Sequence, residues 1–267
     1  GAPPIADAAQ LLEQTLRAQN DIAAVPPVIE MRLSAEPDHA TRAMLLLEIG
    51  QIQEKLNQQS IAFMTICRAV KEVPDDESLR AEAERLAQAT DNLEGLAGVY
   101  EEVLESVRDP QVRVWMHKRI AQISEDVGGD PETARERLVS AVQAGADDAA
   151  TLRDLVRLTR MQGNAEELSS ILLHLAQAAM REGLADVAKE AWGELCDVDE
   201  NLNRLEGAVD AARALLQLDA DDAGAAATLE RLLARAERWP ELAEHLRWEA
   251  ESARTPEDRG NILARLI

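Results

Sequence analysis

The side chains with the widest chemical repertoire in this sequence are its histidines, and their spacing decides whether they could hold a metal ion. Two imidazoles bind zinc from one helix when they stand four residues apart. No pair has that spacing and no cysteine lies near a histidine in the sequence; the histidines are His39, His117, His174 and His245. The sequence therefore predicts no metal site and four surface or half-buried helix histidines.

The two cysteines, Cys67 and Cys196, lie far apart, each inside an apolar helical pattern. Such positions favour buried free thiols over a disulfide. Two cysteines do not determine the redox compartment. No signal peptide is present, so we expect a cytoplasmic protein. Because the chain starts at Gly1 without an initiator methionine, a periplasmic or secreted location stays open.

Nucleophilic and phosphate-binding chemistry has no recognisable motif in the chain. Serine and threonine are sparse, none stands in the strand-turn-helix setting of a nucleophile, and no glycine-rich phosphate loop occurs. Acidic pairs such as Glu101-Glu102 and Glu166-Glu167 are too frequent to be diagnostic, because most suit solvated faces or helix N-termini. We expect no catalytic residue, no cofactor and no enzymatic activity.

The chain is strongly acidic, with 50 Asp and Glu against 28 Lys and Arg, a formal net charge of −22. This charge repels phosphate backbones and anionic lipid surfaces, so we expect no nucleic-acid partner and favour a basic protein segment. An acidic surface that only maintains solubility is the alternative interpretation. No stretch has the apolar length of a membrane span, so no membrane insertion is expected.

The composition and an internal repeat predict the elements that would position any functional side chain. Apolar residues make up 46% of the chain but aromatic residues only 2%, and the abundant Ala, Leu, Glu and Arg are strong helix formers. Paired aspartates recur at spacings of 72 and 74 residues, at Asp75-Asp76, Asp147-Asp148 and Asp221-Asp222. A unit of about 72 residues accommodates two helical hairpins.

Apolar residues at 3.6-residue spacing then predict fifteen helices joined by short turns. They cover residues 5–19, 22–35, 39–57, 59–73, 77–90, 93–107, 110–127, 131–144, 148–162, 165–181, 184–199, 202–218, 223–237, 239–253 and 256–267. Pro26-Pro27 suits a helix start only if the second helix begins one turn later than this pattern places it.

One hairpin of most units carries a specific motif. Residues 43–76 contain Leu46, Ile49 and Gly50 in the first helix, then Ala62, Ile66, Ala69 and Pro74. Gly50 and Ala62 would let the two helices approach closely. Residues 189–222 and 114–148 carry weaker versions, with Trp192, Leu195 and Cys196 in the former. This pattern resembles the tetratricopeptide repeat, in a divergent, bacterial-type array that alternates motif-bearing and degenerate hairpins.

The resemblance implies an all-α fold: a right-handed superhelical solenoid of about seven helix-turn-helix hairpins plus one unpaired terminal helix. Residues 1–267 would form a single domain of double-hairpin units, about 5–76, 77–148, 149–222 and an incomplete 223–267. Other α-solenoid families remain an alternative, since degenerate hairpins of this length resemble one another.

The resemblance also implies where a partner would bind. First helices of tetratricopeptide hairpins line a concave groove, and the corresponding positions here are Met44, Leu47, Gln51, Trp115, Lys118, Gln122, Glu190 and Asp197. Repeats of this family that clamp a peptide carboxylate use a Lys, Arg and Asn cluster, which these positions lack. We therefore expect a basic or amphipathic partner segment.

Tryptophans could supply anchors for that partner. Trp192 and Trp239 occupy positions that predict core packing, whereas Trp115 and Trp248 could be either half-buried or exposed. At the chain end, Ile262, Leu263, Leu266 and Ile267 form an apolar stripe on a helix without a partner, which would allow self-association or a continuation of the array.

The leading functional prediction is a non-enzymatic scaffold or adaptor that binds a protein or peptide partner on the concave surface. The alternatives are a regulatory or partner-recognition region of a larger signalling or enzymatic protein, and a structural array that assembles with copies of itself.

Overall fold

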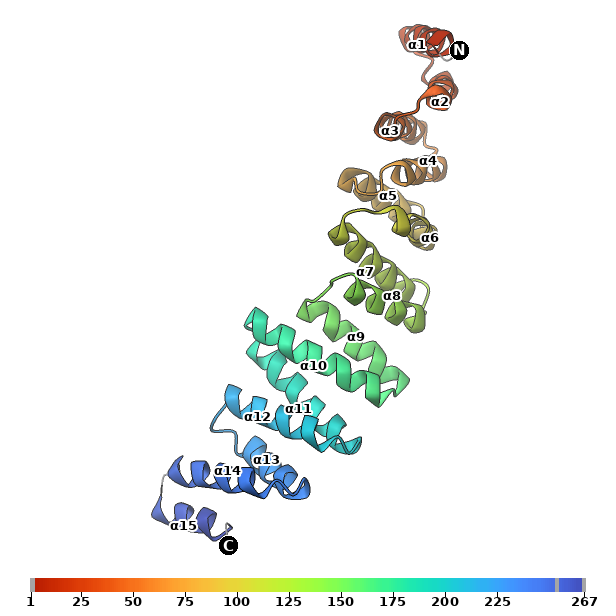
Figure 1. Cartoon of the computed structure of the whole chain (residues 1–267). Coiled ribbons are helices and arrows are strands. Elements are labelled where there is room, and N and C mark those ends of the chain that lie inside the picture. The colour runs from red at the N-terminus through yellow and green to blue at the C-terminus, as the bar shows by residue number, and fades with distance from the viewer. Residues whose placement is uncertain (1–2, 253–254, 266–267) are drawn as a thin grey trace. The chain divides into compact units, whose positions relative to one another are not determined.

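The computed structural model describes residues 3–252 and 255–265, and all regular secondary structure in these ranges is helical. Figure 1 follows the helices in chain order. They are α1 (Pro3–Ala18), η1 (Ile22–Ala24), α2 (Val25–Ala35), α3 (His39–Lys55), α4 (Gln59–Glu72), α5 (Glu77–Ala89), α6 (Leu93–Val103), η2 (Leu104–Ser106), α7 (Pro110–Asp126), α8 (Pro131–Gln143), α9 (Ala149–Gln162), α10 (Ala165–Glu182), α11 (Ala185–Asn201), α12 (Leu205–Leu218), α13 (Ala223–Arg235), α14 (Trp239–Ser252) and α15 (Pro256–Ala264).

The predicted all-α fold of helical hairpins is confirmed, and each α-helix lies where the apolar periodicity predicted one. The clearest difference is at α2, which starts at Val25 after a separate 3₁₀ turn, with Pro26 and Pro27 in its first helical turn. Proline is tolerated there because its missing N–H would have no partner within the helix. The prolines thus mark the true start of the helix, three residues after the predicted one.

The periodic aspartates of the sequence are helix caps. Asp76 accepts a hydrogen bond from Leu79 N at 3.1 Å, and Asp148 accepts one from Thr151 N at 2.9 Å. Asp222 accepts from Gly224 N and Ala225 N, both at 3.0 Å. Each carboxylate satisfies first-turn N–H groups that have no helical partner. The repeat therefore places a helix start after each paired aspartate.

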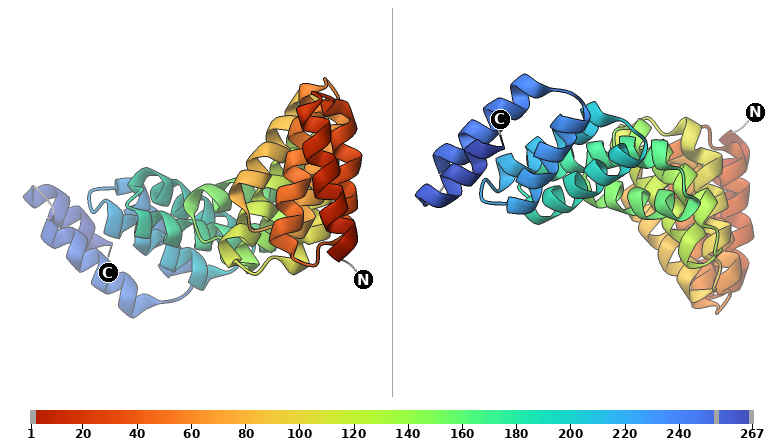
Figure 2. Two further views of the ribbon diagram at one scale, coloured as in Figure 1. Left: turned by 90° about the horizontal axis from the view of Figure 1, so that it is seen from above. Right: turned by 90° about the horizontal axis from the view of Figure 1, so that it is seen from below.

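Close packing within a hairpin depends on small residues, as the motif predicted. Gly50 of α3 is buried, and a Cβ added to it would lie 2.6 Å from Ile66 Cδ1 of α4. Ala62 and Ile66 are fully buried beside it. Figure 2 shows the helices of the hairpins lying side by side. The tight turn between α3 and α4 uses Asn57 at φ 59°, a left-handed conformation that asparagine tolerates better than most residues.

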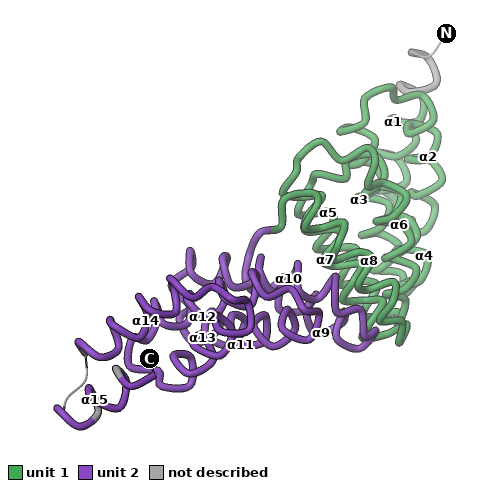
Figure 3. The backbone as a smooth tube through the Cα atoms, turned by 60° about the horizontal axis from the view of Figure 1, so that its bottom comes forward, with its two compact units in different colours: residues 1–146 green, residues 147–267 purple. Residues whose placement is uncertain are grey.

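The chain forms two compact units, here called unit 1 (Gly1–Ala146) and unit 2 (Asp147–Ile267), shown in Figure 3. Unit 1 has one continuous apolar core whose largest fully buried side chains include Ile29, Leu46, Ile66, Leu96 and Ile120. The finer division into double hairpins of about 72 residues and the right-handed superhelix remain predictions.

Ion pairs join successive equivalent helices within each unit. The first helices of the hairpins are α1, α3, α5, α7, α9, α11 and α13. Arg85 of α5 lies 2.7 Å from Glu54 of α3, and Arg160 of α9 lies 2.7 Å from Glu194 of α11. Second helices are joined similarly, with Arg68 of α4 at 2.6 Å from Glu30 of α2. Many cations of the chain are thus engaged by its own carboxylates.

The last described helix, α15, packs against α14. Ile262 of the predicted apolar stripe is half-buried. Leu266, Ile267 and the side chain of Leu263 lie outside the described residues, so self-association through this stripe remains a prediction.

Candidate functional site

The eight side chains predicted to bind a partner divide between the two units. Six belong to α3 and α7 of unit 1, and two belong to α11 of unit 2. Met44 has 62% of its surface exposed, and Trp115 has 38%. Leu47 and Lys118 are half-buried, and the remaining four are exposed, namely Gln51, Gln122, Glu190 and Asp197. All eight are therefore at least partly accessible to solvent.

Trp115 of α7 is held in place by two neighbours from other helices. Its ring lies edge-to-face with Tyr100 of α6, with centroids 5.5 Å apart and planes at 73°. The guanidinium of Arg80, from α5, lies 4.9 Å from the centre of the indole ring. A cation over an indole face and an edge-to-face aromatic pair are both attractive contacts. The exposed ring of Trp115 is thus fixed in orientation before any partner arrives.

Arg80 is itself anchored. Only 7% of its surface is exposed, and its Nη1 donates a hydrogen bond to the carbonyl oxygen of Pro74 at 2.8 Å. That carbonyl belongs to the connection between α4 and α5. The arginine therefore links the turn before α5 to the indole ring on α7, so we expect a substitution of Arg80 to change the orientation of the Trp115 side chain.

Tyr100 extends this cluster to a second ion pair. It is fully buried, and its hydroxyl donates to Glu84 Oε1 at 3.3 Å. Burial raises the pKa of Tyr100, so it remains a neutral donor. Glu84 also accepts from Arg119 Nε at 2.7 Å, a hydrogen bond that raises the pKa of Arg119. The cluster joins α5, α6 and α7 under the exposed face of Trp115.

In unit 2, Glu190 lines a pocket of 270 Å³ between α9, α10 and α11. Three arginines of α9 line the same pocket, namely Arg153, Arg157 and Arg160. Leu172 and Leu175 of α10 also line it. Arg160 makes a two-bond ion pair with Glu194, at 3.0 and 2.7 Å. Beside Glu190 the pocket therefore carries three arginines that are not among the predicted partner-binding positions.

The predicted positions do not include these arginines because they were taken from the motif-bearing hairpins only. The arginines belong to α9, in a degenerate hairpin for which the motif supplied no register. Their spacing was the available signal, because Arg153, Arg157 and Arg160 recur at intervals that place them on one helix face.

The other tryptophans differ in part from prediction. Trp192 is half-buried, and Trp248 is 42% exposed and stacked on His245 with ring centres 6.0 Å apart. The prediction that Trp239 packs in the core is wrong, since 58% of its surface is exposed. Its counterparts in other hairpins, Leu93 and Ile22, are themselves only half-buried. At such a half-buried position the larger indole of Trp239 leaves more of its surface exposed to solvent.

The two thiols are buried, whereas the imidazoles vary in exposure, and His245 is buried, contrary to the prediction of surface or half-buried histidines. Cys67 and Cys196 are buried and free, as predicted, and burial raises their thiol pKa values to about 12 and about 11. His117 is half-buried, and burial lowers its pKa. The described residues contain no group of three His, Cys, Asp or Glu side chains that could hold a metal ion.

Across its described residues the chain offers no helix that combines the length and the apolar character needed to cross a membrane.

Comparisons with known proteins gave structural neighbours only. No family model and no curated protein sequence matches the chain. A solved structure of Naa15/Naa10 bound to HypK-THB matches 95% of this chain at 16% identity with a TM-score of 0.42, and the chain spans 38% of the length of that matched chain. YrrB, whose structure is described as a TPR protein with an unusual peptide-binding site, matches 73% of this chain and 92% of its own at 13% identity, with a TM-score of 0.38. PilF of Pseudomonas aeruginosa matches 88% of this chain and 99% of its own at 12% identity, with a TM-score of 0.34.

Proposed function

We propose that this chain is a non-enzymatic scaffold or adaptor that binds a segment of a partner protein on the first helices of unit 1. The binding residues are those of α3 and α7 predicted from the repeat: Met44, Leu47, Gln51, Trp115, Lys118 and Gln122. Glu190 and Asp197 of α11 are proposed to play the same role in unit 2.

The observation that carries this proposal is the exposed, fixed ring of Trp115. Tryptophan is enriched among the residues that dominate the energy of protein interfaces. A ring already oriented by Arg80 and Tyr100 loses little conformational freedom when a partner covers it. Met44, the other strongly exposed apolar side chain of this set, supplies a second apolar contact.

Charge supports a basic or amphipathic segment as the ligand. Unit 1 and unit 2 each contain 25 carboxylates and 14 Lys or Arg side chains, so each has a formal charge of −11. Such a field speeds encounter with a cationic partner. The α9 arginines beside Glu190 reduce the acidity of that part of unit 2, so the preference for a basic segment should be stronger in unit 1.

The test is a binding measurement with a panel of amphipathic helical peptides that share one apolar face and differ only in net charge. Fluorescence anisotropy at physiological salt should give tighter binding for the basic peptides than for the acidic ones. Trp115→Ala should weaken the basic peptide by at least about tenfold, the loss expected of an interface anchor.

Trp248→Ala is the matched control, because Trp248 is also an exposed tryptophan but lies on α14 of unit 2. It should leave the affinity unchanged. Equal binding of acidic and basic peptides would refute the charge preference, and equal affinities of Trp115→Ala and the unchanged protein would refute the binding surface.

A further inference from the structure

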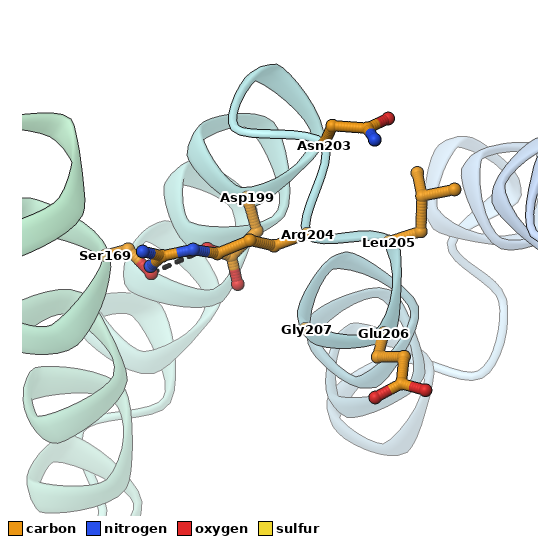
Figure 4. A pocket seen from close by; sticks show the side chains of 7 residues that line it. All are labelled: Ser169, Asp199, Asn203, Arg204, Leu205, Glu206 and Gly207. Carbon is orange, nitrogen blue, oxygen red and sulfur yellow. Dashed lines mark hydrogen bonds between the residues drawn. The ribbon is translucent and has the colours of Figure 1, made fainter.

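A second pocket, of 430 Å³, lies in unit 2 at the turn between α11 and α12, beside α10. Figure 4 shows its lining side chains, which are Ser169, Asp199, Asn203, Arg204, Leu205, Glu206 and Gly207. None of them belongs to the binding surface proposed above. The pocket is notable for a buried acidic group at a position where most hairpins of the chain carry neutral side chains: at the matching distance before the second helix stand Gln53, Ala87 and Thr159.

That group is Asp199 of α11, of which only 5% is exposed. Its Oδ1 accepts a hydrogen bond from the Ser169 hydroxyl at 2.6 Å (Figure 4). Within the described parts of the chain, Asp199 has no ion pair, and its Oδ2 has no hydrogen-bond donor. Burying an ionised carboxylate without a cation is costly, so such a group is normally paired.

Gly207 of α12 keeps the second oxygen of Asp199 accessible. A Cβ at this position would lie 2.2 Å from Oδ2, so any larger residue would displace the carboxylate. The N-terminus of α12 offers partial compensation of about half a unit charge. The neighbouring Glu206 adds a second negative charge, and Arg204 is directed to Glu166, at 3.6 Å. The pocket therefore retains an excess of negative charge.

We propose that this pocket binds the ammonium group of a lysine side chain from a partner protein. Arginine prefers two parallel hydrogen bonds to both oxygens of a carboxylate. One oxygen of Asp199 is already occupied by Ser169, so a compact ammonium group suits the remaining oxygen better. The proposal rests on the proposed function in that the lysine belongs to a partner protein, but it concerns a separate site.

The test uses the full chain and small probes, observed through backbone amide signals in NMR. Acetyl-lysine methylamide should shift the signals of Leu205, Glu206 and Gly207 in a saturable way, with a dissociation constant in the millimolar range. Acetyl-arginine methylamide should bind at least about threefold more weakly, and the uncharged norleucine analogue should cause no shift. Absence of a saturable lysine response, or arginine binding as tightly as lysine, would overturn the assignment.

Two matched pairs of variants locate the site. Asp199→Asn should weaken the lysine probe at least about tenfold, whereas Asp186→Asn, the same charge change at an exposed position of α11, should not. Gly207→Ala should also abolish binding, whereas Gly193→Ala, which meets no atom within 4 Å, should not. If Asp199→Asn failed to fold, the glycine pair would decide. Binding that survives both Asp199→Asn and Gly207→Ala would refute the site.

Arg204 provides the remaining control, because its own guanidinium could fill the pocket. The lysine probe should bind the unchanged protein. If it bound only after Arg204→Gln, the pocket would be occupied by the chain itself and the proposal would be wrong. These outcomes are independent of the peptide measurement at Trp115, so failure of one site leaves the other testable.

Discussion

Unit 1 and unit 2 are built from the same helical hairpins but join them differently. In unit 1, the helix that starts each new hairpin has an aspartate cap followed four residues later by an arginine. This arginine donates to a backbone carbonyl in the last turn of the preceding helix or in the connection after it. The three cases are Asp38 with Arg42, which reaches Leu33 O at 3.1 Å, Asp76 with Arg80, which reaches Pro74 O at 2.8 Å, and Asp109 with Arg113, which reaches Val107 O at 2.8 Å.

At two hairpin junctions of unit 2, α10–α11 and α12–α13, no arginine stands four residues after the residue that precedes the new helix. Between α10 and α11 the chain turns at Gly183, with φ 73°, and Leu184 N donates to Ala179 O at 2.8 Å, a common helix-ending arrangement. Before α13, Asp222 caps the helix, but Ala226 stands four residues later. Hairpins of this chain are thus joined either through an arginine that donates to the preceding backbone or through a turn without such an arginine.

The largest expected effect follows from removing one of these arginines. Arg80→Ala should destabilise the protein by about 2–4 kcal/mol, because it leaves the Pro74 carbonyl unpaired and a cavity beside Trp115. Arg181→Ala in unit 2 is the control, since Arg181 pairs with Asp147 at an exposed site and should cost under about 1 kcal/mol. Urea unfolding followed by circular dichroism would measure both, and equal losses would contradict the contrast between the units.

The reactivity of the two cysteines would show whether the local unfolding caused by Arg80→Ala is confined to unit 1. Cys67 lies in unit 1 and Cys196 in unit 2, and both are protected by burial. In repeat proteins each hairpin contacts mainly its neighbours, so local opening need not spread. Arg80→Ala should therefore raise the rate of Cys67 modification by a thiol reagent at least about tenfold, and that of Cys196 much less. Equal acceleration at both thiols would show that the units open together.

Alanine substitutions at two helical glycines should change the stability by smaller amounts, with opposite signs in the two units. Gly50→Ala in unit 1 should destabilise by about 1 kcal/mol, because the new methyl group would meet Ile66 inside a fully packed hairpin. Gly193→Ala in unit 2 meets no neighbour and should stabilise by up to about 1 kcal/mol through helix propensity. Thermal melting would measure both changes, and two shifts of the same sign would be inconsistent with the packing described here.

An effect no larger than that of the glycines concerns stability in acid. The hydrogen bond from Arg42 lowers the pKa of Glu72 below its ordinary value of 4.5. A carboxyl with a lowered pKa in the folded state contributes its full stability above the ordinary pKa and loses it as the pH falls through the lowered value. Glu72→Gln should cost about 1 kcal/mol at pH 7 and progressively less below pH 4.5.

The exposed pair of Asp147 and Arg181 in unit 2 is the comparison for that acid effect. Asp147→Asn should change the unfolding free energy by under about 0.5 kcal/mol at either pH, because solvent screens an exposed pair. A loss from Glu72→Gln that did not shrink in acid would exclude the ion pair as its cause.

The helices of this chain were predictable because their signals are local. Apolar spacing, the Asp76 and Asp148 caps and the small Gly50 all act within one helix or one hairpin. The roles of Arg80 and Asp199 were not predictable. Arginines on solvated helix faces look the same in sequence as Arg80, and burial of Asp199 depends on the approach of Gly207 from the next helix.

The residues of the candidate binding surface could be predicted from the sequence, but the contacts that support them could not. The repeat register located Met44 and Trp115, both of which are exposed. It did not reveal the support of Trp115 by Tyr100 and Arg80, because those contacts join α5, α6 and α7. It also assigned Trp239 to the core. That assignment is wrong because equivalent positions in a repeat do not bury a larger side chain to the same extent.

The central claim is that a partner binds the first helices of unit 1. The most direct test places a photo-crosslinking amino acid at Gln51 or Gln122, and, as the comparison, at Met64 of α4, which is exposed on a second helix. After illumination with the basic peptide, the first two positions should form crosslinks and Met64 should not. Crosslinks from Met64 alone, or equally from all three positions, would contradict the claim.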